Sequence, residues 1–406
     1  MAFLFSPLRP NGKTLNIFKT SIILAQSFDY IILGAGCAGL SLAVRLVESG
    51  QFADKKILLC DKQPKNLNDR TWCFWEQEPG YFEGIVHHRY DKLWLKHPQG
   101  NLDLDIVPYS YKMIRGIDFY NHCFTILHKA PNVTVMYGEV SGIDTNAGIV
   151  SSGDEQYKAE HIFSSVLLQP PQLHTNQYYL LQHFRGWWVE TSEDFFNPGE
   201  ADMMNFNTSQ EHGCTFVYVL PVSKRRALVE YTLFTEQELQ PEQYDEGLKT
   251  FISQQLHLTD YTIHEVEHGV IPMTNIHFPQ QEGKVVFIGT AGGQTKASTG
   301  YTFRFIQKQS DAIVAALAGS GKLVLPKTAA RFMFYDSVLL RVLQEGKQSG
   351  ADVFYRMFFK NKGRNVLRFL DNESSIGEEL EIMNSTKKSV FVRAGITEFF
   401  KALFPR

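Results

Sequence analysis

The stretch Phe28-Asp29-Tyr30-Ile31-Ile32-Leu33 is followed directly by Gly34-Ala35-Gly36-Cys37-Ala38-Gly39, a complete G-x-G-x-x-G. The apolar run predicts a buried strand, and the apolar positions of residues 40–47 share one face of a helix that ends at Gly50. Lys56–Asp61 then predicts a second strand. This order of strand, glycine turn, helix and strand indicates a Rossmann-like dinucleotide-binding unit, with an ordinary βαβ turn as the alternative.

Each residue of the glycine turn has its own expected role. Gly34 allows the tight turn, Gly36 and Ala35 let the backbone approach a pyrophosphate, and Gly39 lets the helix pack closely on the strand. The first N–H groups of the helix face the phosphates. Asp61 lies 22 positions after Gly39, close to the roughly 20 expected for a carboxylate that binds the ribose. We expect permanently bound FAD rather than a dissociating nicotinamide.

Composition limits the possible classes of protein. At 406 residues the chain is long enough for two or three domains. The net charge of -3 gives no general reason to expect nucleic acid, and an aromatic content of 13% suits a large apolar ligand or membrane contact. Five cysteines without a C-x-x-C indicate reduced thiols and a cytoplasmic setting. The sequence has no run of 18 apolar residues, so we predict no membrane-spanning helix.

The rest of the chain divides by pattern, and the fold class expected is α/β. We expect a leader over 1–27, either disordered, upstream of the true start or a short organelle address. Within the first domain we predict a hairpin over 93–106, a helix with Asp118 as its N-cap, and a three-strand meander over 133–167. A helix is predicted over Glu236–Leu256. The predicted division is as follows: 28–176, first part of the FAD/NAD(P)-binding domain; 177–278, an inserted β-rich domain; 279–325, return of the first domain; 326–406, a C-terminal helical region.

Two further segments have competing interpretations. Residues 353–370 carry five basic side chains, no acids and five aromatic ones, which indicates either an interfacial membrane helix or an ordinary packed helix. His264-Glu265-Val266-Glu267-His268 matches the zinc-protease motif H-E-x-x-H. The segment looks extended, however, and histidines four apart on a strand lie about 13 Å from each other, too far to share one metal ion. We therefore expect no metal.

Glu230 is the candidate acid. On the predicted strand Ala227–Phe234, alternation places Glu230 on one face with Leu228 and Thr232. A glutamate among apolar neighbours is either a solvent-facing strand residue or a desolvated acid with a raised pKa. The spacing alone favours the first interpretation.

Taken together, these segments resemble the flavin-dependent lycopene cyclase family, bacterial β-cyclase branch, over about residues 28–320. The resemblance includes the glycine turn, Asn68–Trp75, Leu228–Thr232, Gly269–Met273 and Gly289–Tyr301, in which Ala297 stands where relatives have proline. It implies an FAD domain, a β-sheet substrate domain to which residues 71–110 contribute, and a peripheral membrane protein of carotenoid biosynthesis. The implied reaction is isomerisation of lycopene, or another acyclic carotenoid, into β-ionone-ended carotenes with reduced FAD, for which NAD(P)H is the expected electron source.

The resemblance also assigns site residues. It changes the interpretation of Glu230, which falls where relatives place their catalytic acid. Protonating an alkene requires an acid kept away from water, and the resulting cation requires π faces nearby. The expected cofactor contacts besides the glycine turn and Asp61 are Arg70, Gly289, Thr290 and Gly292. The expected substrate contacts are Trp72, Phe74, Trp75, Trp187 and Trp188.

Two departures from the family pattern limit this assignment. Many relatives carry a second acid after the catalytic one, where this chain has Tyr231, so a two-carboxylate mechanism is in doubt. The wider flavoprotein group has an aspartate where this chain has Thr290. The rival functions are a prenyl reductase or monooxygenase acting on a lipid or carotenoid, and a carotenoid-binding protein with a vestigial flavin site.

Overall fold

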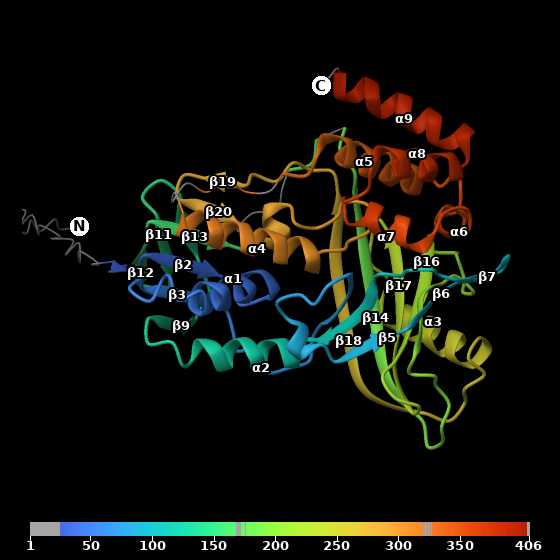
Figure 1. The fold of residues 1–406 in the computed structure, drawn as a ribbon, viewed down its shortest axis with the longest axis horizontal. Coiled ribbons are helices and arrows are strands. Elements are labelled where there is room, and N and C mark those ends of the chain that lie inside the picture. Colours follow the sequence, from blue (N-terminus) through green and yellow to red (C-terminus); the bar gives the residue numbers. More distant parts are fainter. Residues whose placement is uncertain are drawn as a thin grey trace, which may run out of the picture.

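The computed structural model describes residues 25–167, 172–174, 176–319, 323, 325 and 327–403. Figure 1 shows a parallel sheet with its helices at one end, a set of long strands at the other, and the C-terminal helices above those strands. Most of the predicted leader, residues 1–24, lies outside the described residues. Gln26–Ser27, also assigned to the leader, instead form strand β1, which pairs in parallel with β12 (Glu155–Lys158).

The first sheet contains the predicted dinucleotide-binding unit. Its strand order is β19-β20-β13-β2-β3-β9, and all neighbours except β19 are parallel. The predicted strand–turn–helix–strand unit at its centre is confirmed. Because β20 pairs with β13, and β13 with β2, the loop after β20 lies beside the early glycine turn. The elements are β2 (Tyr30–Leu33), α1 (Cys37–Glu48), β3 (Ile57–Asp61), α2 (Gly116–Leu127), β9 (Val133–Tyr137), β13 (His161–Ser164), β19 (Gln281–Glu282), β20 (Val285–Phe287), the 3-10 turn η2 (Gly289–Gly292) and α4 (Phe303–Ala318).

Two predictions for this domain are wrong in detail. Helix α2 is capped at Arg115 rather than Asp118, because the Asp118 carboxylate accepts hydrogen bonds from the Arg115 guanidinium and lies inside the first turn. The predicted three-strand meander is five strands. Strands β9 and β13 join the parallel sheet, whereas β10 (Gly142–Asp144), β11 (Ile149–Ser152) and β12 form a separate small sheet with β1. Strands β10 to β12 form the connection between β9 and β13. This connection is long because both strands run in the same direction in the sheet, and parallel strands cannot be joined by a short turn.

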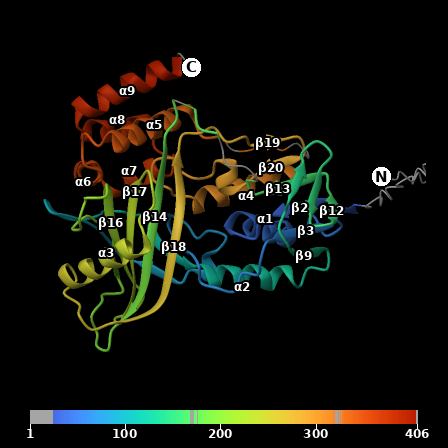
Figure 2. The same cartoon turned by 180° about the vertical axis from the view of Figure 1, so that it is seen from behind.

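The second sheet has seven strands in the order β18-β14-β17-β16-β15-β6-β7, antiparallel except where β15 meets β6. The predicted hairpin is confirmed as β6 and β7. Helix α3 (Pro241–Gln254) covers one face of this sheet, as Figure 2 shows from behind. The helix begins later than predicted, because Gln240 caps it in a capping box with Gln243 and Pro241 occupies its first position. The strands are β6 (Lys92–His97), β7 (Gly100–Asp103), β14 (Tyr179–Glu190), β15 (Glu200–Asn205), β16 (Cys214–Pro221), β17 (Arg226–Thr235) and β18 (Thr262–Thr274).

A third, three-stranded sheet lies between these two parts of the molecule. It consists of β4 (Thr71–Glu76), β8 (Ser110–Arg115) and β5 (His88–Tyr90), with the 3-10 turn η1 (Glu83–Ile85) before β5. Strand β4 contributes Trp72 and Phe74 to the core of the dinucleotide-binding part, and Cys73 and Trp75 to the core of the second sheet. The six-stranded and seven-stranded sheets share no strand. The proposed domain boundaries themselves remain a prediction.

The C-terminal region is helical, as predicted: α5 (Ala330–Glu345), α6 (Gly350–Lys360), α7 (Gly363–Leu370), α8 (Ile376–Ser385) and α9 (Lys388–Leu403). The segment 353–370 is not one interfacial helix. It breaks between α6 and α7, and Phe354, Tyr355 and Phe358 are buried in the core of the second sheet. Among the described residues, no helix combines the length and apolarity needed to cross a bilayer.

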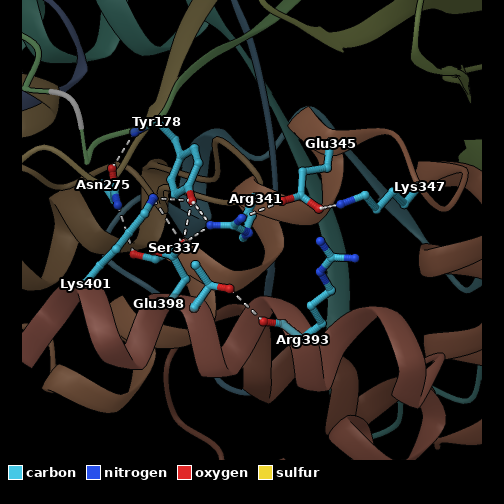
Figure 3. Close-up of polar contacts among 10 residues, drawn as sticks. Tyr178, Asn275, Ser337, Arg341, Glu345, Lys347, Arg393, Glu398 and Lys401 are labelled. Atoms are coloured by element: carbon cyan, nitrogen blue, oxygen red, sulfur yellow. Dashed lines mark hydrogen bonds and ion pairs between the residues drawn. The ribbon is translucent and has the colours of Figure 1, made fainter.

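A buried polar cluster attaches α9 to the rest of the protein (Figure 3). The Glu398 carboxylate accepts hydrogen bonds from the Tyr178 hydroxyl at 2.5 Å and from Arg341 at 3.1 Å. Lys401 donates to the same Tyr178 oxygen at 2.7 Å. Because Glu398 is buried, its charge needs these partners, and the cluster fixes α9 against α5 and the start of β14.

The packing of α6 predicts which of its phenylalanines stabilises the fold. The Phe354 ring is fully buried and lies 6.3 Å from the Phe206 ring and 5.9 Å from the Phe234 ring. Phe354→Ala should therefore lower the free energy of unfolding by about 3–5 kcal/mol, measured by urea denaturation. Phe359→Ala, five residues later on the exposed side of the helix, is the control and should change it by less than about 0.5 kcal/mol. Equal effects of the two substitutions would contradict this packing.

Candidate active site

The early and late glycine loops meet at the start of α1. A Cβ on Gly39 would lie 1.9 Å from the Gly34 carbonyl oxygen, so only glycine allows the helix to pack this closely on the turn. Gly34 has φ +94°, which favours glycine. In the late loop, a Cβ on Gly289 would lie 2.7 Å from Ala38 Cβ. The two loops are thus in direct contact, although 250 residues separate them in the sequence.

The start of α1 has the features of an anion site. A Cβ on Gly36 would meet no atom within 4 Å, so the space in front of the turn is open. No side chain caps the helix and its first turn has no acidic residue, which leaves its N–H groups and the positive end of the helix dipole available. Asp61, at the end of β3, accepts a 2.7 Å hydrogen bond from the Ala35 N–H and pairs with Lys65 at 3.1 Å.

A cavity of about 540 Å³ extends from this turn to the second sheet. Of the predicted site residues, it brings together Gly36, Arg70, Trp72, Glu230, Gly289 and Thr290. Its remaining wall is largely aromatic and aliphatic. Its other lining residues include Thr71, Cys73, Tyr111, Tyr218, Tyr301 and Phe303.

The other four predicted aromatic contacts do not line this cavity. Trp187 lies on the opposite face of β14 and packs under α3, because side chains alternate along a strand. Trp188 and Trp75 are buried in the core of the second sheet, and Phe74 stacks on Phe303 with ring centroids 4.3 Å apart. Gly292 also lies outside the cavity, where a Cβ would meet the Phe287 carbonyl oxygen at 2.2 Å.

Glu230 is buried, with 9% of its surface exposed. It lies on β17 on the same face as Leu228 and Thr232, as alternation predicts, and accepts a 3.1 Å hydrogen bond from the Thr232 hydroxyl. Burial, and then the neighbouring Glu267 carboxyl group, raise the pKa of Glu230 well above its ordinary value. Both effects favour the protonated form of this carboxyl group.

Glu267 is the neighbouring acid that the sequence interpretation missed. It lies on β18, is 2% exposed, and accepts a 2.9 Å hydrogen bond from the Thr71 hydroxyl. Burial raises the pKa of Glu267 as well, opposed by the Thr71 hydrogen bond, by the hydrogen bond to Glu230 and by the Arg70 charge. Tyr231, which occupies the position of the second acid in many relatives, packs under α3 on the other face of β17.

The H-E-x-x-H segment that contains Glu267 lies within strand β18, as predicted. Its two histidines point outward, where His264 pairs with Glu190 at 3.0 Å and His268 with Glu238 at 3.1 Å. Between them Glu267 faces inward, whereas Glu265 is partly exposed and pairs with Arg226 at 2.8 Å. Alternation along this extended segment, with outward histidines, was the signal that could have placed Glu267 on an inward face.

Burial keeps several other titratable groups on the cavity wall neutral, because it raises their pKa values above the ordinary ones. These groups are the Tyr111, Tyr218 and Tyr301 hydroxyls and the Cys73 thiol. Lys65, Asp69 and Arg70 also line the cavity, so its wall has ionisable groups besides Glu230.

Comparison with known proteins identifies the relatives of this chain. The sequence model of one family, described as "Lycopene cyclase protein", matches residues 29–394. The lycopene beta-cyclase of Pantoea ananas is 23% identical over 302 residues, which cover 71% of this chain and 74% of that protein.

Two solved structures show the same fold. A geranylgeranyl bacteriochlorophyll reductase-like protein from Thermoplasma acidophilum has a TM-score of 0.60 at 12% identity, over 92% of this chain and 100% of that chain. A flavoprotein/dehydrogenase from Cytophaga hutchinsonii has a TM-score of 0.59 at 13% identity, over 93% of this chain and 100% of that chain. The predicted α/β fold class with a Rossmann-like domain is confirmed.

The glycine turn predicts two different outcomes for two similar substitutions. Gly39→Ala places a methyl group 1.9 Å from a carbonyl oxygen, so it should lower the free energy of unfolding by about 1–3 kcal/mol or more. Gly36→Ala points into open space and should change it by less than about 0.5 kcal/mol. Chemical denaturation of the two ligand-free variants measures this, and a greater loss for Gly36→Ala would contradict the geometry.

Proposed function

Because this chain belongs to the lycopene cyclase family, we propose that it is a lycopene beta-cyclase. It closes the linear ends of lycopene into β-ionone rings, giving γ-carotene or β-carotene without net oxidation or reduction. In enzyme terms it is an isomerase of the intramolecular lyase class. The observation that carries the proposal is a buried carboxyl group, Glu230, in a mostly apolar cavity that opens onto a dinucleotide-type glycine turn.

FAD fits the residues at the other end of this cavity. The open space at Gly36 and the free N–H groups of α1 suit its pyrophosphate. We propose that Asp61, which pairs with Lys65, binds the ribose. Arg70, Gly289 and Thr290 line the cavity where the ring system would lie. When bound in its reduced form, the cofactor would supply negative charge that stabilises a substrate cation. We propose NAD(P)H as the electron source, although the net reaction consumes none.

Glu230 performs the proton transfers. Its carboxyl group gives a proton to the terminal C=C bond of the polyene, and the neighbouring double bond attacks the resulting cation to close a six-membered ring. A proton then leaves the ring and returns to the Glu230 carboxylate, so atoms and electrons balance. A cavity of about 540 Å³ is of the size that holds a compact organic ligand, which suits one end of the polyene at a time.

The cavity wall protects the cation. Aromatic faces stabilise positive charge, and the exclusion of water prevents its capture as an alcohol. We propose Trp72, Tyr111, Tyr218 and Tyr301 for this role, since they line the cavity. Trp75, Trp187 and Trp188, which the resemblance had proposed, lie elsewhere in the core and support the sheet.

Contact with a membrane would bring the hydrocarbon substrate to the protein. Helix α9 exposes Val392, Ile396, Phe399 and Leu403, and basic side chains such as Arg393 lie beside them. An exposed apolar face bordered by cations is typical of interfacial helices. We therefore propose α9, rather than residues 353–370, as the surface that contacts lipid.

The direct test uses purified protein with bound, prereduced FAD and lycopene in liposomes, without oxygen. Formation of γ-carotene or β-carotene, which have the same mass as lycopene, supports the proposal. A product that has gained hydrogen or oxygen, with consumption of reduced nicotinamide, would instead identify a reductase or monooxygenase. Bound pigment that stays unchanged would identify a binding protein.

Glu230→Gln should lower the cyclisation rate by at least about 100-fold, because an amide cannot donate the proton. Bound FAD, measured by its absorbance per mole of protein, should not change. Tyr231→Phe is the matched control, since the neighbouring residue lies on the opposite face of β17 and should keep its activity. A Glu230→Gln enzyme that cyclises lycopene at the normal rate would exclude Glu230 as the acid.

A further inference from the structure

Glu230 and Glu267 lie on different strands, and β14 separates them. In the sheet, Gly186 of β14 is the register partner of Glu230 on one side and of Glu267 on the other. Two strands that flank a third are about 9–10 Å apart, which is normally too far for short acidic side chains to meet. Here they meet because the residue between them has no side chain.

Contacts at Gly186 show how tightly this space is used. A Cβ on Gly186 would lie 3.0 Å from Glu267 Cγ, 3.2 Å from Glu267 Oε1 and 2.9 Å from Leu228 Cδ1. The Glu267 side chain therefore lies directly over the glycine, with its carboxyl group next to that of Glu230. Any other residue at position 186 would occupy the space in which the two acids meet.

The hydrogen bonding of Glu267 requires a proton between the two groups. Oε2 of Glu267 accepts from Thr71, but Oε1 is buried, and no amide, hydroxyl or cationic donor in the described part of the chain bonds to it. Two carboxylates cannot hydrogen-bond to each other unless one of them is protonated. A proton on Glu230 would supply the missing donor for Glu267 Oε1.

We propose that Glu267 is a positioning residue for Glu230: the two carboxyl groups meet over Gly186 and share one proton, so that Glu230 presents a protonated acid to the cavity. Glu267 does not line the cavity and acts through Glu230. With one shared proton, the pair carries a single negative charge that the adjacent Arg70 balances. The catalytic part of this inference rests on the proposed cyclase function, whereas the shared proton does not.

The same pair explains how one carboxyl group can act as acid and then as base. Once Glu230 has given up its proton, two carboxylates face each other in a site with little water, which is unfavourable. Recovery of a proton from the ring relieves this repulsion, and the pair returns to its starting state. The groups that face the pair from the packed elements are Arg70, Thr71, Cys73, Tyr218, Thr232 and Glu265.

The first experiment measures the proton directly. Infrared spectra of the holoprotein without substrate should show the C=O stretch of a protonated carboxylic acid at neutral pH, and Glu230→Gln should remove it. In Glu267→Gln the band should titrate at a pH lower by about one unit or more, because the like charge is gone. Glu190→Gln, a matched change at an exposed carboxylate on β14, should alter neither. An absent band, or a smaller or opposite shift in Glu267→Gln, would overturn the inference.

The second experiment follows the pH dependence of lycopene cyclisation. Since removing the anionic neighbour lowers the pKa of Glu230, the alkaline limb of the rate profile should move to lower pH in Glu267→Gln by the same amount. Gly186→Ala, whose methyl group displaces the Glu267 side chain, should move it in the same direction, with bound FAD and circular dichroism as tests of folding. An unchanged limb in folded Glu267→Gln protein would overturn the inference.

The two experiments separate two kinds of failure. A wild-type protein with the expected infrared titration but no conversion of lycopene would refute the proposed function and leave the shared proton in place. Conversion of lycopene by a protein without a protonated carboxylic acid at neutral pH would support the cyclase and refute the shared proton.

Discussion

Strand β14 is hydrogen-bonded along both of its edges, to β17 and to β18, and the chemistry of the cavity depends on this double pairing. The two registers place Glu230, Gly186 and Glu267 in one row across the sheet. A slip of one residue in either pairing would turn one acid to the opposite face. Register is in turn set by burial, since Trp187 and Tyr231 pack under α3 and cannot exchange places with residues on the cavity face. The apolar core under α3 thus determines the position of the acids on the other side.

The local parts of this architecture were predictable and the long-range parts were not. The early glycine turn could be recognised because strand, turn and helix periods lie within some 30 consecutive residues. Glu230 could be assigned to the correct face by alternation alone. Alternation could have placed Glu267 on an inward face as well, but not beside Glu230, because which strands flank β14 follows from the pairing of segments far apart in the sequence. The start of α2 was misplaced because Asp118 pairs with Arg115 instead of capping the helix.

The aromatic residues show the same limit. Resemblance grouped five aromatic side chains near the acid, yet only Trp72 lines the cavity. On β4, Trp72 and Cys73 lie on opposite faces and both reach the cavity, because this short sheet lies between the two halves of the molecule. On β14, by contrast, α3 covers one face, so Trp187 on that face does not reach the cavity. The resemblance therefore identified strands close to the acid, but not which of their aromatic side chains face the cavity.

The buried titratable groups along the cavity fit the proposed acid-catalysed isomerisation. Burial keeps the Tyr111, Tyr218 and Tyr301 hydroxyls and the Cys73 thiol neutral, so none of them is a base near neutral pH. Two carboxyl groups, Asp69 and Glu230, lie on the described wall of the cavity, and burial raises the pKa of Glu230 well above its ordinary value. In the proposed reaction, a substrate cation would meet neutral aromatic faces and the Glu230 carboxylate, an arrangement that suits ring closure and return of the proton. The environment that makes Glu230 hold its proton therefore also limits what can happen after the proton is given.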